Sequence, residues 1–178
     1  MKGNNTENLQ FPIGKYTPPK VITTDFIQYA IAQIEQLPAK IKRVVDQMSE
    51  DQFDNTYRPG AWTARQVLYH IGDSHLHSYV RFKWALTEDS PTIKAYDQDG
   101  WGGLFDSTGS SVNSSMKFIE VLHERWVSLL KGIDEPGWEK TFYHPQMERH
   151  IALKWNAGLY AWHGNHHLAH LEIIADNR

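Results

Sequence analysis

The 178-residue chain contains no cysteine, and this absence removes several kinds of chemistry. Disulfide bonds, thiolate zinc sites and a cysteine nucleophile are excluded, so any metal ion must be held by nitrogen and oxygen ligands. No stretch reaches the roughly 18 apolar residues that a membrane-spanning helix needs, and the polar first residues lack the apolar core of a secretion signal. We therefore expect a soluble, cytoplasmic protein with no membrane partner.

The chain also lacks a basic face or tail. Its 18 Lys and Arg are scattered among 21 Asp and Glu, and the formal net charge is -3. Nucleic acid is therefore not an expected partner, because binding to phosphates requires clustered positive charge. The length suits a single domain over residues 1–178 with a sizeable core. Residues 1–10 of this domain are expected to form a flexible N-terminal tail.

Apolar residues recur at helical spacing in four long stretches. These stretches cover residues 26–48, 63–86, 110–133 and 153–175. Four long helices in one small domain predict an all-α fold built as a four-helix bundle. Pro38 is expected to kink or interrupt the first helix, since proline lacks the amide proton that a helix interior needs. A long loop, residues 87–110, separates the second and third helices, and a small hairpin is expected at 141–144 and 149–152.

Histidine is abundant, with ten residues, and the last helix carries the most informative group. His163 and His167 are four residues apart, so both imidazoles can point at one metal ion from the same helix face. The pair His166 and His170 has the same spacing, but its mean direction is further from the centre of the apolar face. We therefore favour His163 and His167 as ligands.

A third ligand must come from another helix, and the second helix offers two histidines on one polar face. His70 and His77 share this face with Asp73, Ser74 and Arg81. The face is either a solvated stripe or the lining of an internal pocket, which is where helical bundles hold metals and ligands. Spacing alone leaves the choice between His70 and His77 open.

Several short motifs follow one another in a recognisable order. They are Phe11-Pro12-Ile13-Gly14-Lys15-Tyr16, Gly60-Ala61-Trp62-Thr63-Ala64-Arg65-Gln66-Val67, Asp73-Ser74-His75, Arg81-Phe82-Lys83 and Tyr160-Ala161-Trp162-His163-Gly164-Asn165-His166-His167. With them, the chain resembles the YfiT-type metal-dependent hydrolases of the DinB-like superfamily from about Phe11 to Leu171. The resemblance implies an up-and-down four-helix bundle, often a homodimer, with one zinc or nickel ion on His70, His163 and His167. It implies no DNA binding.

Three functions are consistent with such a site. The first is a hydrolase in which the ion activates water, because three histidines leave coordination positions open. The second is an S-transferase that joins a low-molecular-weight thiol resembling bacillithiol to an electrophile, as some relatives do. The third is a metal-binding bundle without catalysis. The expected partner is a small-molecule substrate, which in the second case is a thiol.

Residues near the predicted ligands are candidates for further roles. Asp73 and Tyr160 are candidate catalytic groups, although Asp73 is equally suited to orient a histidine ring or to face solvent. Arg81 is a candidate for binding an anionic substrate group, with an ordinary salt bridge as the alternative. His123, His144 and His150 have no metal-ligand spacing and are interpreted as surface or core residues.

Overall fold

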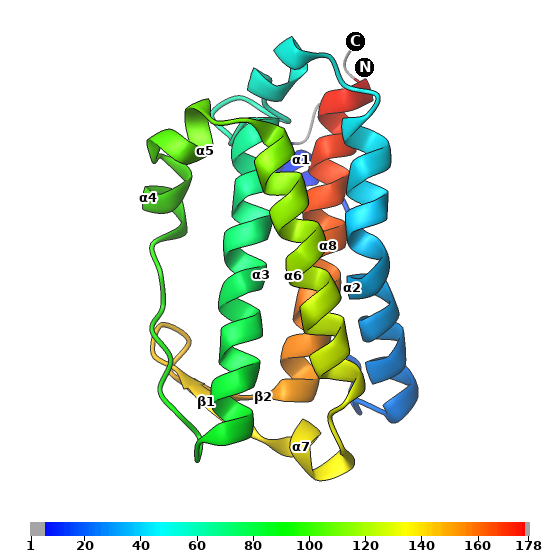
Figure 1. The fold of residues 1–178 in the computed structure, drawn as a ribbon, viewed down its shortest axis with the longest axis vertical. Coiled ribbons are helices and arrows are strands. Elements are labelled where there is room, and N and C mark those ends of the chain that lie inside the picture. The colour runs from blue at the N-terminus through cyan, green and yellow to red at the C-terminus, as the bar shows by residue number, and fades with distance from the viewer. Residues whose placement is uncertain (1–5, 177–178) are drawn as a thin grey trace.

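The structure, a computed structural model, describes residues 6–176 and contains four long helices (Figure 1). They are α2 (Thr24–Val45), α3 (Ala64–Thr87), α6 (Val112–Lys131) and α8 (Leu153–Asp176). The predicted all-α four-helix bundle is thus confirmed. The shorter elements are α1 (Thr6–Gln10), η1 (Glu50–Asp54), α4 (Gln98–Gly102), α5 (Phe105–Gly109), α7 (Glu135–Glu139), β1 (Thr141–His144) and β2 (Arg149–Ala152). Of these helices, none is long and apolar enough to cross a membrane in the described part of the chain.

The order of helix directions differs from the simple up-and-down arrangement that the resemblance implied. In Figure 1, α2 and α8 run upward along the colour gradient, whereas α3 and α6 run downward. Each long helix packs against two others: α2 and α3 both contact α6 and α8. The helices α2 and α3 therefore lie diagonally across the bundle, as do α6 and α8, whereas α3 and α6 are neighbours that run in the same direction. The reason is the long segment after α3, which carries the chain back along the bundle so that α6 starts at the same end as α3.

Side-chain caps define where the helices start. The Thr63 hydroxyl accepts a hydrogen bond from the Gln66 amide at 3.2 Å, and the Gln66 side chain accepts one from the Thr63 amide at 2.9 Å. This reciprocal capping box confirms the predicted start of α3. Thr23 and Ser111 cap α2 and α6 in the same way, by accepting from backbone amides.

Pro38 does not interrupt the first helix, so of the two predicted effects, a kink or an interruption, the interruption is wrong. Helix α2 runs through it without a break. Proline cannot donate to the carbonyl four residues earlier, which belongs to Ile34. His123 of α6 supplies the missing donor, with its Nδ1 atom 2.7 Å from the Ile34 oxygen. A contact from a neighbouring helix therefore satisfies the carbonyl that Pro38 leaves without an intrahelical partner.

The segment between α3 and α6 is more ordered than the predicted loop. It contains α4 and α5, and its first part pairs with the hairpin: the Ile93 amide donates to the Tyr143 oxygen, and the Tyr143 amide donates to the Pro91 oxygen. The predicted hairpin is confirmed, with β1 and β2 antiparallel and Thr141 opposite Ala152. The segment is thereby held against the bundle beside α3.

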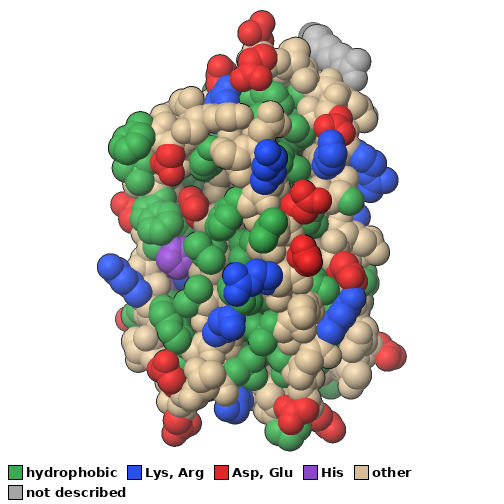
Figure 2. Space-filling view, viewed as in Figure 1, with side chains coloured by type: hydrophobic (Ala, Val, Ile, Leu, Met, Phe, Trp, Pro, Cys, Tyr) green, Lys and Arg blue, Asp and Glu red, His purple; other side chains and the backbone are tan. Residues whose placement is uncertain are grey.

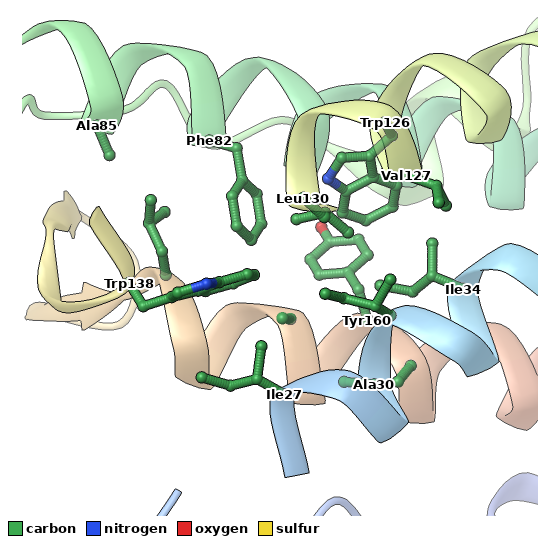
Figure 3. Packing of buried hydrophobic residues seen from close by; sticks show 14 of the residues in the cluster. Ile27, Ala30, Ile34, Phe82, Ala85, Trp126, Val127, Leu130, Trp138 and Tyr160 are labelled. Carbon is green, nitrogen blue, oxygen red and sulfur yellow. The ribbon is translucent and has the colours of Figure 1, made fainter. Parts of the chain in front are cut away.

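The hydrophobic core is divided into two clusters along the bundle. Figure 3 shows part of the first, in which Phe82, Trp126 and Tyr160 pack together. The second cluster lies toward the other end and includes Leu37, Leu68 and Leu171. On α8, the first cluster ends at Ala161 and the second begins at Leu168, so His163, His166 and His167 lie between them.

Two further observations concern the surface and the first residues. Figure 2 shows acidic and basic side chains interspersed over one face, as the scattered sequence charges suggested. The predicted flexible tail, residues 1–10, is partly helical, because Thr6–Gln10 form α1. The Gln10 carbonyl lies 3.3 Å from His170 Nε2, which connects this helix to α8. Residues 1–5 lie outside the described part.

Candidate metal centre

The structure brings His70 of α3 together with His163 and His167 of α8. One ring nitrogen from each lies within 4.8 Å of the others, and the Nε2 atoms of His70 and His163 are 3.2 Å apart. His70 and His167 are buried, and His163 is partly buried. The competing candidate, His77, instead stacks on Tyr96 with ring centroids 4.2 Å apart. The geometry therefore favours His70 over His77 as the companion of the α8 pair.

All three rings are held in the neutral form. Burial lowers the pKa of His70 to about 4 and moves the pKa values of His163 and His167 well below their usual range. Neighbouring histidines add a smaller effect of the same sign, because a second positive charge nearby is unfavourable. Each ring therefore carries one nitrogen lone pair near pH 7, which is the form that binds a metal ion.

The second nitrogen of His163 begins a row of hydrogen bonds that crosses the bundle. His163 Nδ1 lies 3.1 Å from His75 Nε2, and His75 Nδ1 lies 2.9 Å from His123 Nε2. His123 ends the row at the Ile34 carbonyl. We call His163, His75 and His123 the histidine row. His75 and His123 are almost completely buried, with exposed fractions of 0% and 2%.

The carbonyl at the end of this row determines where each proton lies. A carbonyl only accepts, so His123 must donate from Nδ1, and its Nε2 must then accept from His75. By the same reasoning, His75 Nε2 accepts from the Nδ1–H of His163. All three rings are neutral, since burial lowers the pKa of His123 to about 4 and that of His75 well below 6.5. The lone pair of His163 therefore lies on Nε2, which faces His70.

His167 has a similar arrangement on the other side. Its Nδ1 atom lies 3.3 Å from His170 Nδ1, and His170 Nε2 faces the Gln10 carbonyl at 3.3 Å. His170 donates to this carbonyl, so its Nδ1 accepts from His167. The lone pair of His167 is then on Nε2. His170 itself is stacked on Tyr57, with ring centroids 3.7 Å apart.

The less favoured pair, His166 and His170, also lies close to His167, one of the three predicted ligands. Together with His167, these residues place three ring nitrogens within 4.8 Å of one another. His166 Nδ1 is buried with no hydrogen-bond partner among the described residues. This second group shares His167 with the first group, so the two groups compete for the nitrogens of one ring.

Two of the remaining predicted site residues, Arg81 and Tyr160, line a cavity that meets a second cavity at His163. One cavity, of about 430 Å³, is lined by Ser74, Arg81, Tyr160 and His163 among others. The Ser74 hydroxyl donates to the Tyr160 oxygen at 3.4 Å. The other cavity, of about 420 Å³, is lined by all three predicted ligands. His70, Ser74 and Arg81 of the polar face of α3 therefore line cavities, whereas Asp73 and His77 line neither of the two.

Asp73 stands apart from the other candidates. It is half-buried and lines neither of these two cavities. Burial, with a smaller contribution from Asp106, raises its pKa to about 6. Its carboxyl group therefore changes charge near neutral pH, but the cavity beside the histidines does not include it.

Sequence reasoning missed the contribution of His75, His123 and Tyr96. The Tyr96 hydroxyl lies 3.4 Å from His70 Nδ1, so it completes the set of outer partners of the three rings. One signal was present in the sequence: His123 falls within the apolar stripe of its helix, between Ile119 and Trp126. A histidine in such a stripe requires a buried hydrogen-bond partner.

Comparison with known proteins places the chain in a family. Residues 33–171 match the family model described as the DinB superfamily. "Putative metal-dependent hydrolase YfiT" of Bacillus subtilis (strain 168) is 42% identical over 168 residues, which cover 94% of each chain. A "Putative metal-dependent hydrolase" of Bacillus cereus (strain ATCC 10987 / NRS 248) is 45% identical over 168 residues, 94% of this chain and 95% of the relative.

A solved structure agrees with the fold. The structure of YfiT from Bacillus subtilis matches with a TM-score of 0.92 at 40% identity, and the match covers 95% of this chain and 97% of that one. That protein is described as having "an unusual four-helix bundle topology". From this fold and these sequence matches, we conclude that the chain belongs to the DinB superfamily.

Proposed function

We propose that this protein is a metal-dependent hydrolase that holds one divalent ion, zinc or nickel, on His70, His163 and His167. The observation that carries the proposal is the convergence of three neutral imidazoles, with nitrogens within 4.8 Å of one another. Relatives at 42–45% identity carry the name "Putative metal-dependent hydrolase", which supports the same activity here.

The donor set fits such an ion. Imidazole nitrogen is a preferred ligand of zinc and nickel, and three protein ligands leave room for a further ligand. When bound, an ion of this kind supplies Lewis acidity, which polarises a carbonyl group and lowers the pKa of water to about 7. The protein's own contribution is to keep the three imidazole rings neutral and to orient their lone-pair nitrogens toward the ion.

Tyr160 is the better placed of the two candidate catalytic groups. It lies one turn before His163 on α8, and its oxygen already accepts from Ser74. Its own hydroxyl proton is therefore available to stabilise negative charge that develops on a substrate oxygen in the adjoining cavity. Asp73 ranks second: its pKa of about 6 suits proton transfer, but it does not line this cavity.

Arg81 suggests that the substrate carries an anionic group. Its side chain is 7% exposed, forms no salt bridge within the described residues, and has a buried Nε atom without a partner. Buried charges in proteins are normally paired, because desolvation is costly. A carboxylate or phosphate group in the cavity would provide the pair, and the planar guanidinium suits either.

Thiol transfer is the second candidate function. Three neutral ligands would leave the charge of a divalent ion uncompensated, which favours an anionic ligand such as a thiolate. The absence of cysteine from the chain is compatible with this reaction, because the thiol is a substrate.

The test combines metal content with turnover. Untagged wild-type protein is compared with His70→Ala, His163→Ala and His167→Ala, and His150→Ala serves as an exposed histidine control. We expect one equivalent of metal and hydrolysis of activated esters in the wild type and control, and loss of both in the three folded variants. Metal retained in all three variants would refute the site. Consumption of a thiol with an electrophile, without ester hydrolysis, would select the transferase, and metal without turnover would indicate a non-catalytic bundle.

A further inference from the structure

The two ligands on α8 share a feature that metal binding alone does not require. The Nδ1 atom of each lies within hydrogen-bond distance of a nitrogen of another histidine, and each of these partners is connected to a main-chain carbonyl. On one side the connection runs through His123 to Ile34, and on the other it runs directly to Gln10. Neutral imidazoles replace the carboxylates that often hold metal-binding histidines.

We propose that His75 and His170 are positioning residues that hold His163 and His167 in the tautomer with the lone pair on Nε2, and that His123 fixes His75 in turn. The proposal extends the proposed metal site to three residues without metal-ligand roles. Because a carbonyl accepts and never donates, the carbonyl groups of Ile34 and Gln10 each fix which nitrogen donates in every hydrogen bond of the row that ends at them.

Pro38 explains why the Ile34 carbonyl can serve this purpose. In an uninterrupted helix this oxygen accepts from the amide of residue 38, but proline has no amide proton. The carbonyl is therefore without an intrahelical donor, and a buried oxygen in that state requires another. His123 approaches from α6 and provides it at 2.7 Å. A proline in α2 thereby orients a ligand on α8 through His123 and His75.

His70 differs from the other two ligands, because its outer partner is a hydroxyl group. The Tyr96 hydroxyl can either donate to His70 Nδ1 or accept from it. With the lone pair of His163 fixed on Nε2, the 3.2 Å contact between the two Nε2 atoms needs a proton on His70 Nε2 when no ion is bound. Metal binding would move this proton to Nδ1, where Tyr96 accepts it. One ligand of the three can thus change tautomer.

The second histidine group offers a competing explanation for His170. An ion held by His166, His167 and His170 would need a lone pair from His167 on that side. A single neutral ring could serve both ions only after losing its one remaining N–H proton. The hydrogen bond from His170 to the Gln10 carbonyl accounts for the observed contacts with His167 neutral.

The test follows the tautomers and the zinc affinity in full-length protein. Ring nitrogens with and without a proton resonate in separate regions of a nitrogen-15 spectrum, so histidine labelling reports the tautomer of His163 directly. His123→Leu removes both the donor and the acceptor of the row. His123→Gln keeps one of each, and His150→Leu is the matched control outside the row.

We expect wild-type His163 to carry its proton on Nδ1, and His123→Leu to produce a mixture of tautomers. Zinc affinity, measured by competition with a chromogenic chelator, should fall about ten- to a hundredfold in His123→Leu and in His170→Leu. His123→Gln should return to within about threefold of wild type. A merely structural role for His123 predicts no such change in tautomer.

Three results would overturn the proposal. The first is a wild-type His163 with its proton on Nε2, a measurement that stands even if a variant fails to fold. The second is a folded His123→Leu protein with unchanged tautomer and affinity. The third is a protein that binds two equivalents of zinc and loses one of them when His166 is replaced. This result would overturn the positioning role of His170. A wild-type protein that binds no zinc refutes the proposed function instead, and the nitrogen spectrum then decides the tautomers independently.

Discussion

At the scale of single residues, Arg81 is the most direct evidence that the proposed substrate carries an anionic group. Replacing it with Gln should reduce kcat/KM for an ester with a carboxylate at its far end by about tenfold or more, because a charge-assisted hydrogen bond contributes about 1.5–3 kcal/mol. The measurement compares mono-4-nitrophenyl glutarate with neutral 4-nitrophenyl acetate in both proteins. Arg43→Gln, an exposed arginine on α2, is the control. Equal losses for both esters would argue against an anionic group.

Gly164 allows α2 and α8 to approach each other between two predicted ligands. A Cβ atom there would lie 2.4 Å from Leu37 Cδ2, and Leu37 is buried in the second core cluster. Gly164→Ala should lower the free energy of unfolding by about 1–3 kcal/mol, despite the better helix propensity of alanine. Chemical denaturation measures the change. Gly109→Ala, where nothing lies within 4 Å, should be close to neutral, and an equal loss there would exclude the close approach as the cause.

The residues also show what could be predicted of the site. His163 and His167 follow from helical spacing, and a resemblance in sequence motifs selected His70. His75 and His123 could not be recognised in this way, because their partners lie on other helices and at distant positions in the sequence. The arrangement of the row depends on which helices are adjacent, and periodicity contains no information about that.

At the scale of elements, the capping box of α3 is a direct test of why the helix begins where it does. Thr63→Ala removes the oxygen that accepts from the Gln66 amide, and it should reduce stability by about 1 kcal/mol. A lower Tm, measured by circular dichroism, is the expected outcome. The exposed Thr17→Ala variant should leave Tm unchanged. If both variants have the same Tm, the cap does not determine the stability of this end.

Element boundaries were predicted well where local signals exist. Caps fixed the starts of α2, α3 and α6, and the hairpin strands were predicted at their observed positions. Helices α4 and α5 were missed, because each has only five residues and carries no clear periodicity. The interruption expected at Pro38 was wrong, since tertiary contact with His123 compensates for the missing amide.

At the scale of the whole molecule, buried neutral histidines should make the metal-free protein sensitive to mild acid. Burial lowers the pKa values of His123, His166 and His170 to about 4. In the unfolded chain these groups titrate near 6.5, so the unfolded state binds more protons below that pH. Stability is therefore full above about pH 6.5 and should fall by about 1.4 kcal/mol per pH unit for each histidine down to pH 4.

The check is denaturant unfolding of metal-free protein at several pH values between 4 and 8. Replacing His123 by Gln, which does not titrate, should reduce the slope by the contribution of one proton. A stability that is constant between pH 6.5 and 4 would mean that these rings are not buried in neutral form.

The diagonal arrangement of α2 and α3 has a consequence for how the protein is made. Helix α2 packs against α6 and α8, which are synthesised after α3, so a nascent chain that ends near residue 111 contains neither neighbour of α2. Such a chain cannot bury the apolar face of α2 against its native partners, and we expect it to remain unfolded on the ribosome. Helix α2 gains its first native partner, α6, only once synthesis has passed Lys131, and its second partner only with α8. The four-helix packing is complete only with the histidine-bearing last helix, so the helix that carries two of the proposed ligands also completes the bundle.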